Sequence, residues 1–372
     1  RPLGNRIGDQ NMLIKSVETD TYRLPLPRPV EAAAAGLLTG FDMVAVRVTA
    51  ENGETGTGYT AVMQNQGPAI QAIISNVFIP ILQGKDYSLI ENHWMKMWKV
   101  HHYSGRGGPV SFAIAAVDVA LWDLKGLILG DPLWRLLGGF SNKVKAYAGN
   151  IDLNFPLDKL LEGASESLAL GHKSIKMRMG KPSIAEDISR ATAMRNHLPD
   201  HIELMADVNE AWRVDQASKA MKALSPLGLV WIEEPLTPDD FAGYRHLRSL
   251  GEVPIAAGEN LHTLPEFTQL IGQGCVDFPE PDFTTCGGIT PFMKIARLAE
   301  AHNLPIISHG AHDIHVHLLA ACNNGAYLEV HAFGIDEFIE QPMVINNGYA
   351  TAPDRPGHGV NFDWDKLKSY KV

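Results

Sequence analysis

The sequence predicts an α/β protein in which a (β/α)8-type barrel follows a smaller N-terminal α+β domain. Beyond residue 143, eight short apolar or β-branched runs alternate with helical segments, which is typical of parallel βαβ units. Eight such units predict a barrel. A doubly wound open sheet is the competing architecture, but no Gly-x-Gly-x-x-Gly motif follows an early strand, and this weakens it.

The first 140 residues carry the patterns of the α+β domain. Alternating apolar and polar residues predict strands over 13–24, 43–49 and 55–60. The stretch 51–54, Glu-Asn-Gly-Glu, is a turn signal that joins the last two strands in a hairpin. The spacing of apolar residues predicts helices over 68–82, 89–100 and 111–129, after which Pro132 and Gly138-Gly139 interrupt the chain.

The barrel elements follow in a regular rhythm. Strands are expected at 144–148, 174–177, 203–206, 229–232, 254–257, 276–279, 305–308 and 326–328. Helices are expected at 157–170, 184–197, 214–224, 239–249, 264–273, 290–302 and 312–323. We therefore divide the chain into a tail (1–11), the N-terminal domain (12–142), the barrel (143–340) and a C-terminal segment (341–372).

The composition narrows the possible partners. With 45% apolar and 20% charged residues, the 372-residue chain has the balance of a folded globular protein. Its 32 basic and 42 acidic residues give a net charge of −10, which argues against nucleic acid or an anionic membrane as a partner. The three cysteines lie outside any Cys-x-x-Cys spacing, and no secretory leader or membrane-spanning stretch is visible, so we expect a cytoplasmic protein.

Three successive strand-like runs in the barrel region each end on a carboxylate: Asp207, Glu233 and Glu259. In a barrel the carboxyl ends of the strands face the active site, so these side chains should converge. Converging carboxylates repel one another unless a hard cation neutralises them. The trio contains no His or Cys, so the sequence predicts an all-oxygen Mg²⁺ site rather than a zinc site.

Further polar residues follow the other runs. Lys176 and Arg178 are two residues apart on one strand and should point the same way. Asp282 and His309 end adjacent strands, so the carboxylate could hold the imidazole in one tautomer and raise its basicity. Glu329 follows the eighth run. A catalytic acid–base pair beside the metal site is therefore expected.

Four histidines, at 309, 312, 315 and 317, raise the alternative of a separate zinc site. His312 and His315 are three residues apart on a predicted helix and could share a face. His309 is already assigned to the acid–base pair, and helix packing accounts for the other three. We therefore favour packing over metal binding for them.

These residues, in this order, make the chain resemble the enolase superfamily, specifically its mandelate racemase subgroup. The likeness covers nearly the whole chain, including an N-terminal α+β capping domain and a C-terminal segment that returns to it. The stretches that carry it are Lys176-Met177-Arg178, Ala206-Asp207-Val208-Asn209, Trp231-Ile232-Glu233-Glu234-Pro235, Ala257-Gly258-Glu259-Asn260, Pro281-Asp282, Gly287-Gly288-Ile289-Thr290, Ile307-Ser308-His309 and Leu328-Glu329.

The resemblance implies Mg²⁺-assisted removal of the proton α to a substrate carboxylate. It assigns Asp207, Glu233 and Glu259 to the metal, Lys176 to the substrate carboxylate, His309 with Asp282 to acid–base catalysis, Glu329 to a hydrogen bond with the carboxylate as a neutral acid, and Asn209 to the neighbourhood of the substrate. A divalent cation and a lysine would both stabilise the negative charge that develops. A small-molecule carboxylate is thus the expected partner.

Arg178 departs from the racemase pattern, in which a lysine at this position is a base on one face of the substrate. A guanidinium stays protonated near neutral pH and is a poor base. We therefore expect a one-base reaction: syn dehydration of a hydroxy acid or acid sugar to a 2-keto-3-deoxy acid. A racemase, an epimerase or a lactone cycloisomerase remains the alternative within enzymes, and a binding protein on a degenerate barrel is the alternative outside them.

The N-terminal domain should shape the substrate site. The stretch 32–38, Ala-Ala-Ala-Ala-Gly-Leu-Leu, is small and apolar, which weakens the case for an aldarate and leaves a less polar acid or a lactone open. Tyr59 is a polar candidate for substrate binding in the same domain. Apolar stretches in this domain also lead us to expect a homo-oligomer.

Overall fold

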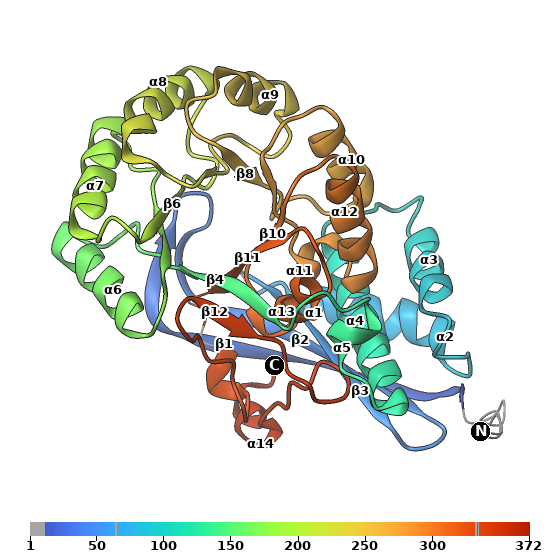
Figure 1. Ribbon diagram of the computed structural model, residues 1–372. Coiled ribbons are helices and arrows are strands. Elements are labelled where there is room, and N and C mark those ends of the chain that lie inside the picture. The colour runs from blue at the N-terminus through green and yellow to red at the C-terminus, as the bar shows by residue number, and fades with distance from the viewer. Residues whose placement is uncertain (1–11, 64, 332, 334) are drawn as a thin grey trace.

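The computed structural model describes residues 12–372 except 64, 332 and 334, so the predicted 1–11 tail lies outside the described residues. Eight parallel strands form a nearly closed barrel in the order β10-β11-β4-β5-β6-β7-β8-β9, which confirms the predicted fold class (Figure 1). The strands are β4 (Lys143–Gly149), β5 (Ser174–Arg178), β6 (Glu203–Asp207), β7 (Ile232–Glu233), β8 (Ile255–Ala257), β9 (Phe278–Pro279), β10 (Ile306–Ser308) and β11 (Gly325–His331).

Helices surround these strands, as the βαβ rhythm predicts (Figure 1). They are α6 (Leu157–Ala169), α7 (Ile184–His197), α8 (Val214–Leu224), α9 (Phe241–Leu250), α10 (Leu264–Gly272), α11 (Phe283–Cys286), α12 (Ile289–Ala301) and α13 (His312–Ala320). The short α11 was not predicted; its first turn is capped by the Asp282 carboxylate, which accepts a hydrogen bond from the Thr284 amide at 2.7 Å.

The N-terminal domain is a three-stranded antiparallel sheet covered by helices. Its strands are β1 (Ile14–Ala32), β2 (Gly36–Ala50) and β3 (Thr55–Val62), and β2 and β3 form the predicted hairpin. Its α-helices are α1 (Gly67–Ile73), α2 (Ile79–Leu82), α3 (Ile90–Val100), α4 (Pro109–Leu129) and α5 (Leu133–Leu136). β1 runs well past residue 24, because its pairing with β2 continues to the Ala32–Gly36 pair. The apolar 32–38 stretch is therefore the tip of a long hairpin.

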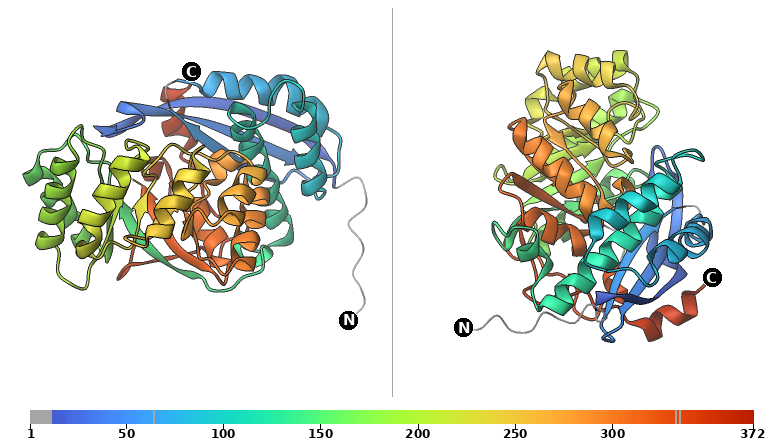
Figure 2. Two further views of the ribbon diagram at one scale, coloured as in Figure 1. Left: turned by 90° about the horizontal axis from the view of Figure 1, so that it is seen from above. Right: turned by 90° about the vertical axis from the view of Figure 1, so that its right-hand side faces the viewer.

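The domain lies over one end of the barrel (Figure 2). Asp118 of α4 accepts hydrogen bonds from the Thr290 amide and hydroxyl of α12, at 2.8 and 2.7 Å. At the C-terminus, β12 (Tyr349–Thr351) pairs antiparallel with β4, and the Val372 amide donates to the Thr21 carbonyl of β1 at 3.0 Å. These contacts fix the N-terminal domain above the carboxyl ends of the strands.

The long helix α4 is the central packing element between the two parts. It begins with Pro109 at its first turn and ends at Gly130, whose φ of +71° suits the left-handed C-cap of a helix. Buried residues occur on all its sides, so it is surrounded by protein. No helix in the described part of the chain combines the length and apolarity that crossing a membrane requires.

Gly58 of β3 permits the close approach of the sheet to α4, and this contact yields a stability prediction. A Cβ at residue 58 would overlap the α4 backbone at Ala116 and Ala120. We expect Gly58→Ala to lower the free energy of unfolding by about 1–3 kcal/mol, the usual cost of overpacking. Urea unfolding followed by circular dichroism measures it.

The matched control is Gly163→Ala in α6, where the new methyl group meets open space. That variant should be neutral or more stable, because alanine is the better helix former by about 1 kcal/mol. Equal stability of the Gly58→Ala and wild-type proteins would show that β3 and α4 can separate without cost.

Candidate active site and metal centre

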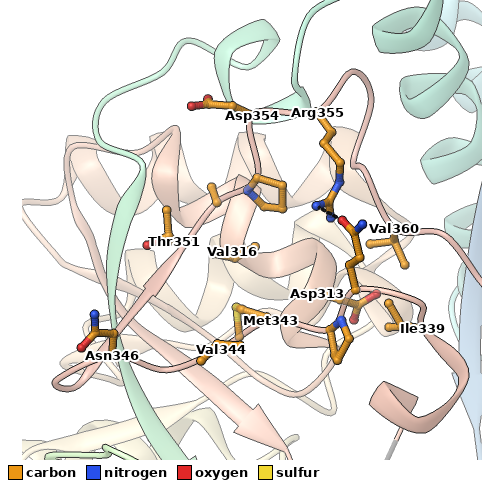
Figure 3. Close-up of a pocket in the computed structure, with 14 residues that line it drawn as sticks. Asp313, Val316, Ile339, Met343, Val344, Asn346, Thr351, Asp354, Arg355 and Val360 are labelled. Atoms are coloured by element: carbon orange, nitrogen blue, oxygen red, sulfur yellow. Dashed lines mark hydrogen bonds between the residues drawn. The ribbon is translucent and has the colours of Figure 1, made fainter.

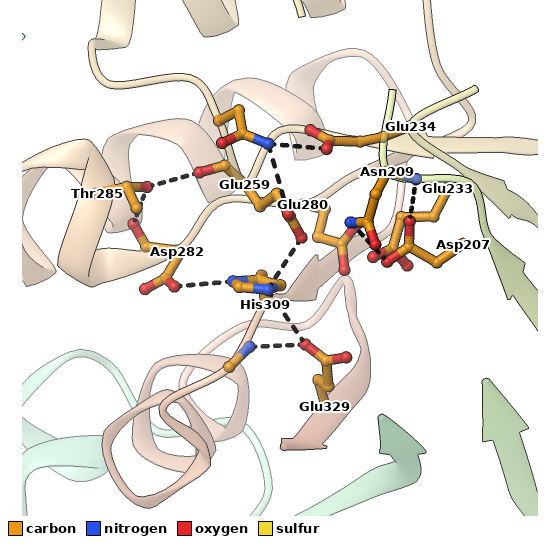
Figure 4. Close-up of polar contacts among 12 residues, drawn as sticks. Asp207, Asn209, Glu233, Glu234, Glu259, Glu280, Asp282, Thr285, His309 and Glu329 are labelled. Carbon is orange, nitrogen blue, oxygen red and sulfur yellow. Dashed lines mark hydrogen bonds and ion pairs between the residues drawn. The ribbon is translucent and has the colours of Figure 1, made fainter. Parts of the chain in front are cut away.

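Asp207, Glu233 and Glu259 converge at the carboxyl ends of β6, β7 and β8. Asp207 and Glu233 are paired residues of neighbouring strands, and Glu259 follows the end of β8. One carboxylate oxygen from each lies within 4.8 Å of the others (Figure 4). Asp207 and Glu233 are fully buried, and the Glu259 side chain is 12% exposed. A buried set of oxygen donors is what a hard divalent cation requires, so the trio fits Mg²⁺.

Two cations from β5 reach the same cluster, as their two-residue spacing predicts. Lys176 Nζ lies 2.5 Å from Glu233 Oε1 and 2.7 Å from Glu329 Oε1. Arg178 Nη1 contacts Asp207 Oδ2 and lies 3.0 Å from Asn209 Oδ1. Burial alone would lower the pKa of Lys176, but Glu233 and Glu329 raise it. The pKa of Arg178 is likewise raised by neighbouring carboxylates, so both side chains are positively charged in this arrangement.

His309 and Asp282 form the expected pair. His309 Nδ1 lies 2.9 Å from Asp282 Oδ2, so the carboxylate holds the imidazole with Nε2 directed at the carboxylates (Figure 4). Nε2 is 2.9 Å from Glu259 Oε2 and 3.8 Å from Glu329 Oε2. Burial opposes the charged ring, but Glu259, Glu329 and the Asp282 hydrogen bond raise the pKa of His309 well above its usual value. His309 is thus the group placed to carry a proton beside the metal site.

Glu329 lies between Lys176 and His309. It lies on β11, with Oε2 accepting a hydrogen bond from the Gly310 amide at 2.8 Å. Burial would raise the pKa of this carboxyl, but Lys176 and then His309 lower it well below its usual value. In this arrangement Glu329 pairs with Lys176, and its role as a neutral acid toward a substrate carboxylate stays a prediction.

Tyr59 lies in the packed core and not at the cavity wall. Its side chain is buried, and its ring packs edge-on against Phe283 and Phe362. Its hydroxyl donates to Asp313 Oδ1 at 2.6 Å. Tyr59 is not among the residues that line the cavity beside the trio, because this position of β3 faces the core between the domain and the C-terminal segment. It is a packing residue, and the expectation that it binds substrate is wrong.

A cavity of about 600 Å³ lies between the capping domain and the polar cluster. Glu259, Asp282, His309, Arg178 and Asn209 line its barrel side. Apart from Gln66, its opposite wall is apolar and includes Ala32, Ala34, Ala35, Leu38, Val62, Met63, Ile70 and Phe112. The 32–38 hairpin tip therefore borders the site, as expected.

The cavity also exposes residues that sequence reasoning missed, above all His331. It lies two residues beyond Glu329 on β11, so the period of two in a strand places both on one face and could have identified it. Burial and repulsion from His309 lower the pKa of His331, whereas Glu329 raises it. The lowering effects are larger and bring the pKa to about 3, so the ring is neutral. His262, Glu210 and Asn260 line the cavity as well.

The three helical histidines each have a hydrogen-bond partner outside their own group, which is in keeping with the predicted packing role. His312 Nε2 pairs with Asp336 Oδ1, His315 Nδ1 with the Gly310 carbonyl and His317 Nε2 with the His358 carbonyl, at 2.8–2.9 Å. A separate hollow of about 480 Å³ lies between α13 and the C-terminal segment, lined by Asp313 and Arg355 among others (Figure 3). No trio carboxylate is among its described lining residues.

The charge pattern predicts the effect of removing one metal ligand. Asp207→Asn should weaken Mg²⁺ binding by at least the roughly 10- to 100-fold that loss of an outer-shell partner costs. Isothermal titration calorimetry should give one ion per chain for the wild-type protein. Asp158→Asn, on the exposed start of α6, is the control and should bind as the wild type does. Equal Mg²⁺ affinity of the Asp207→Asn and wild-type proteins would refute the trio assignment.

Comparison with known proteins agrees with this geometry. The model of the mandelate racemase/muconate lactonizing enzyme N-terminal domain matches residues 16–138, and that of the enolase C-terminal domain-like family matches 159–366. The chain is 44% identical over 356 residues to a 3,6-anhydro-alpha-L-galactonate cycloisomerase of Streptomyces coelicolor, covering 95% of this chain and 98% of the relative. It is 34% identical to an L-talarate/galactarate dehydratase of Salmonella typhimurium, covering 94% and 88%.

Solved structures show the same likeness. A racemase from Streptomyces coelicolor with bound magnesium has a TM-score of 0.95 at 43% identity, covering 97% of this chain and all of that one. An L-talarate dehydratase from Polaromonas, complexed with Mg and L-glucarate, has a TM-score of 0.90 at 34% identity, covering 97% of each chain. The predicted Mg²⁺ cofactor and the choice of an enzyme over a binding protein are confirmed. The chain belongs to the mandelate racemase/muconate lactonizing enzyme family of the enolase superfamily.

Proposed function

We propose that this enzyme removes the proton α to the carboxylate of a sugar acid and expels the oxygen substituent of the next carbon, which gives a 2-keto-3-deoxy acid. The observation that carries the proposal is the direction of His309. Asp282 holds Nδ1, and Nε2 faces the cavity beside Glu259. A substrate carboxylate at the metal site would bring its α-proton to this nitrogen.

The residues of the site have separate roles in removing the α-proton. Mg²⁺, when bound by Asp207, Glu233 and Glu259, supplies a Lewis acid for the substrate carboxylate. Lys176 adds a buried positive charge next to it, which favours the negative charge that develops on the substrate. His309 takes the α-proton at Nε2, and Asp282 holds the resulting imidazolium in place.

The elimination then needs a proton on the leaving oxygen. His309 can return it from Nε2, so the C–H and the neighbouring C–O bonds break on one face and a C=C bond forms between the two carbons. The enol that results becomes the 2-keto acid by taking a proton at C3. Arg178 supports this one-base path, because it lines the cavity as a permanently charged guanidinium. Racemisation by two bases would need a second proton acceptor at this position, and a protonated Arg178 does not provide one.

The cavity lining favours a monocarboxylate. Arg178 is the one lysine or arginine among the described residues that line the cavity, and it lies at the barrel side. A second carboxylate at the far end would face Ala34, Leu38 and Phe112 without a counter-charge. We therefore propose a compact sugar monoacid, such as a 3,6-anhydro acid whose ring ether replaces two hydroxyl groups, in keeping with the named substrate of the Streptomyces coelicolor relative.

Two products distinguish the cyclic from the open-chain substrate. Opening an anhydro ring by this elimination keeps all atoms and gives an isomer, whereas an open-chain hydroxy acid loses one water. We expect purified enzyme with Mg²⁺ to convert 3,6-anhydrogalactonate to a 2-keto-3-deoxy acid of unchanged mass, measured by mass spectrometry and a keto-acid assay. Conversion of open-chain aldonates alone would favour a dehydratase.

The role of His309 is tested in D₂O. Wild-type enzyme should exchange the α-proton without inverting the α-carbon, because one base serves one face. His309→Asn should lower turnover by roughly 100-fold or more, in line with the loss of a general acid–base group. His312→Asn, which removes a packing histidine outside the cavity, is the control. Full activity of His309→Asn, or inversion at the α-carbon, would overturn the proposal.

The monoacid preference is tested at the hairpin tip. Leu38→Arg places a cation on the apolar cavity wall and should raise kcat/KM for a dicarboxylate relative to a monocarboxylate, by tenfold for each roughly 1.4 kcal/mol of new ion pairing. Leu37→Arg is the matched control, because residue 37 is 64% exposed and is not among the described residues that line the cavity. A wild-type preference for dicarboxylates would show that our substrate class is wrong.

A further inference from the structure

We propose that His309, Glu329 and His331 form a second metal site, for a borderline transition-metal ion such as Zn²⁺, beside the Mg²⁺ trio. One ligand atom from each of the three lies within 4.8 Å of the others. His309 Nε2 is 3.8 Å from Glu329 Oε2, and the two imidazole rings meet with centroids 5.4 Å apart. The cluster is separate from the trio in its residues, since it shares none with Asp207, Glu233 and Glu259.

The strands place these three side chains together. Glu329 and His331 are two residues apart on β11, so both side chains point to the inside of the barrel mouth. His309 follows β10, which is the parallel neighbour of β11. Ligands that come from the ends of adjacent strands need no loop rearrangement to approach a common ion, and sites on rigid elements hold their geometry best.

Outer contacts already orient two of the ligands. Asp282 holds His309 at Nδ1, the carboxylate–histidine arrangement that fixes the tautomer of a metal-binding imidazole. The Gly310 amide donates to Glu329 Oε2 at 2.8 Å, which fixes that carboxylate. His331 is 8% exposed, and its Nδ1 is buried without a hydrogen-bond partner among the described residues. A buried, unpaired imidazole nitrogen in this cluster requires an explanation.

The donor set selects the ion. Two imidazoles and one carboxylate suit Zn²⁺, Co²⁺ or Ni²⁺, and catalytic zinc sites with this set keep a further position open. Mg²⁺ prefers the all-oxygen trio. Glu259 of the trio lies 2.9 Å from His309 Nε2, so the two clusters adjoin at this contact. Paired divalent ions about 3.5–4 Å apart occur in two-metal enzymes, so the two sites are compatible.

Occupation of this site would inhibit the enzyme, because the ion would take the Nε2 lone pair of His309. That consequence rests on the proposed function, in which His309 is the base. The binding itself does not, so a failure of metal binding and a failure of the catalytic proposal are distinguishable.

The test uses Co²⁺ as the probe on enzyme saturated with Mg²⁺. We expect one equivalent of Co²⁺ to give the intense visible absorption of a low-coordinate site with nitrogen ligands, and excess Mg²⁺ should not remove it. His331→Gln should weaken Co²⁺ binding by roughly 10- to 100-fold or more. His262→Gln, in the same cavity but outside the cluster, is the control and should keep the wild-type affinity.

Two further measurements keep the proposal falsifiable if a variant does not fold. X-ray absorption of Zn²⁺ on the wild-type, Mg²⁺-loaded enzyme should show two imidazole ligands. Asp207→Asn should lose Mg²⁺ affinity and keep the Co²⁺ band. Absence of tight Co²⁺ or Zn²⁺ binding, a Co²⁺ band that Mg²⁺ displaces, or Zn²⁺ without imidazole ligands would each overturn the second site.

Discussion

Charge balance at the mouth of the barrel is the constraint on which the rest of the site depends. The side chains of Asp207, Glu233 and Glu329 have no exposed surface, and Lys176 lies among them. An unpaired buried ion costs several kcal/mol, so these carboxylates need cations within reach. Lys176 pairs with both Glu233 and Glu329, and Arg178 contacts Asp207. The remaining negative charge of the trio is left to a divalent ion. The same balance explains why the net charge of −10 says little about the substrate.

The two parts of the chain contribute differently to the site. The barrel supplies every charged group of the reaction, since each strand end places a side chain at the same face. The capping domain supplies an apolar wall through the tip of its β1–β2 hairpin, and α4 holds the domain in place through the Asp118–Thr290 hydrogen bonds. Chemistry therefore depends on rigid strands, and substrate selection depends on a hairpin whose sequence can change without disturbing them.

Much of the site follows from strand periodicity alone. The trio and the His309–Asp282 pair could be predicted because each residue lies at the end of an apolar run or within three residues beyond it, which fixes its end of the barrel. The pairing of Glu329 with Lys176 at 2.7 Å could not, since no spacing in the sequence reveals it. The burial of Tyr59 could not be predicted either, because strand periodicity does not show which face of a strand meets the core. The exact domain limits stay a prediction. Self-association also stays a prediction, because a single chain shows no interface between copies.

The most direct test of the central claim is a crystal structure of the enzyme grown with Mg²⁺. If charge balance organises the site, one ion will be bound by oxygens of Asp207, Glu233 and Glu259, and the Arg178 guanidinium will have left Asp207 for the cavity. Lys176 will remain on Glu329. An ion bound elsewhere, or Arg178 still paired with Asp207 and no ion between the three carboxylates, would contradict the account.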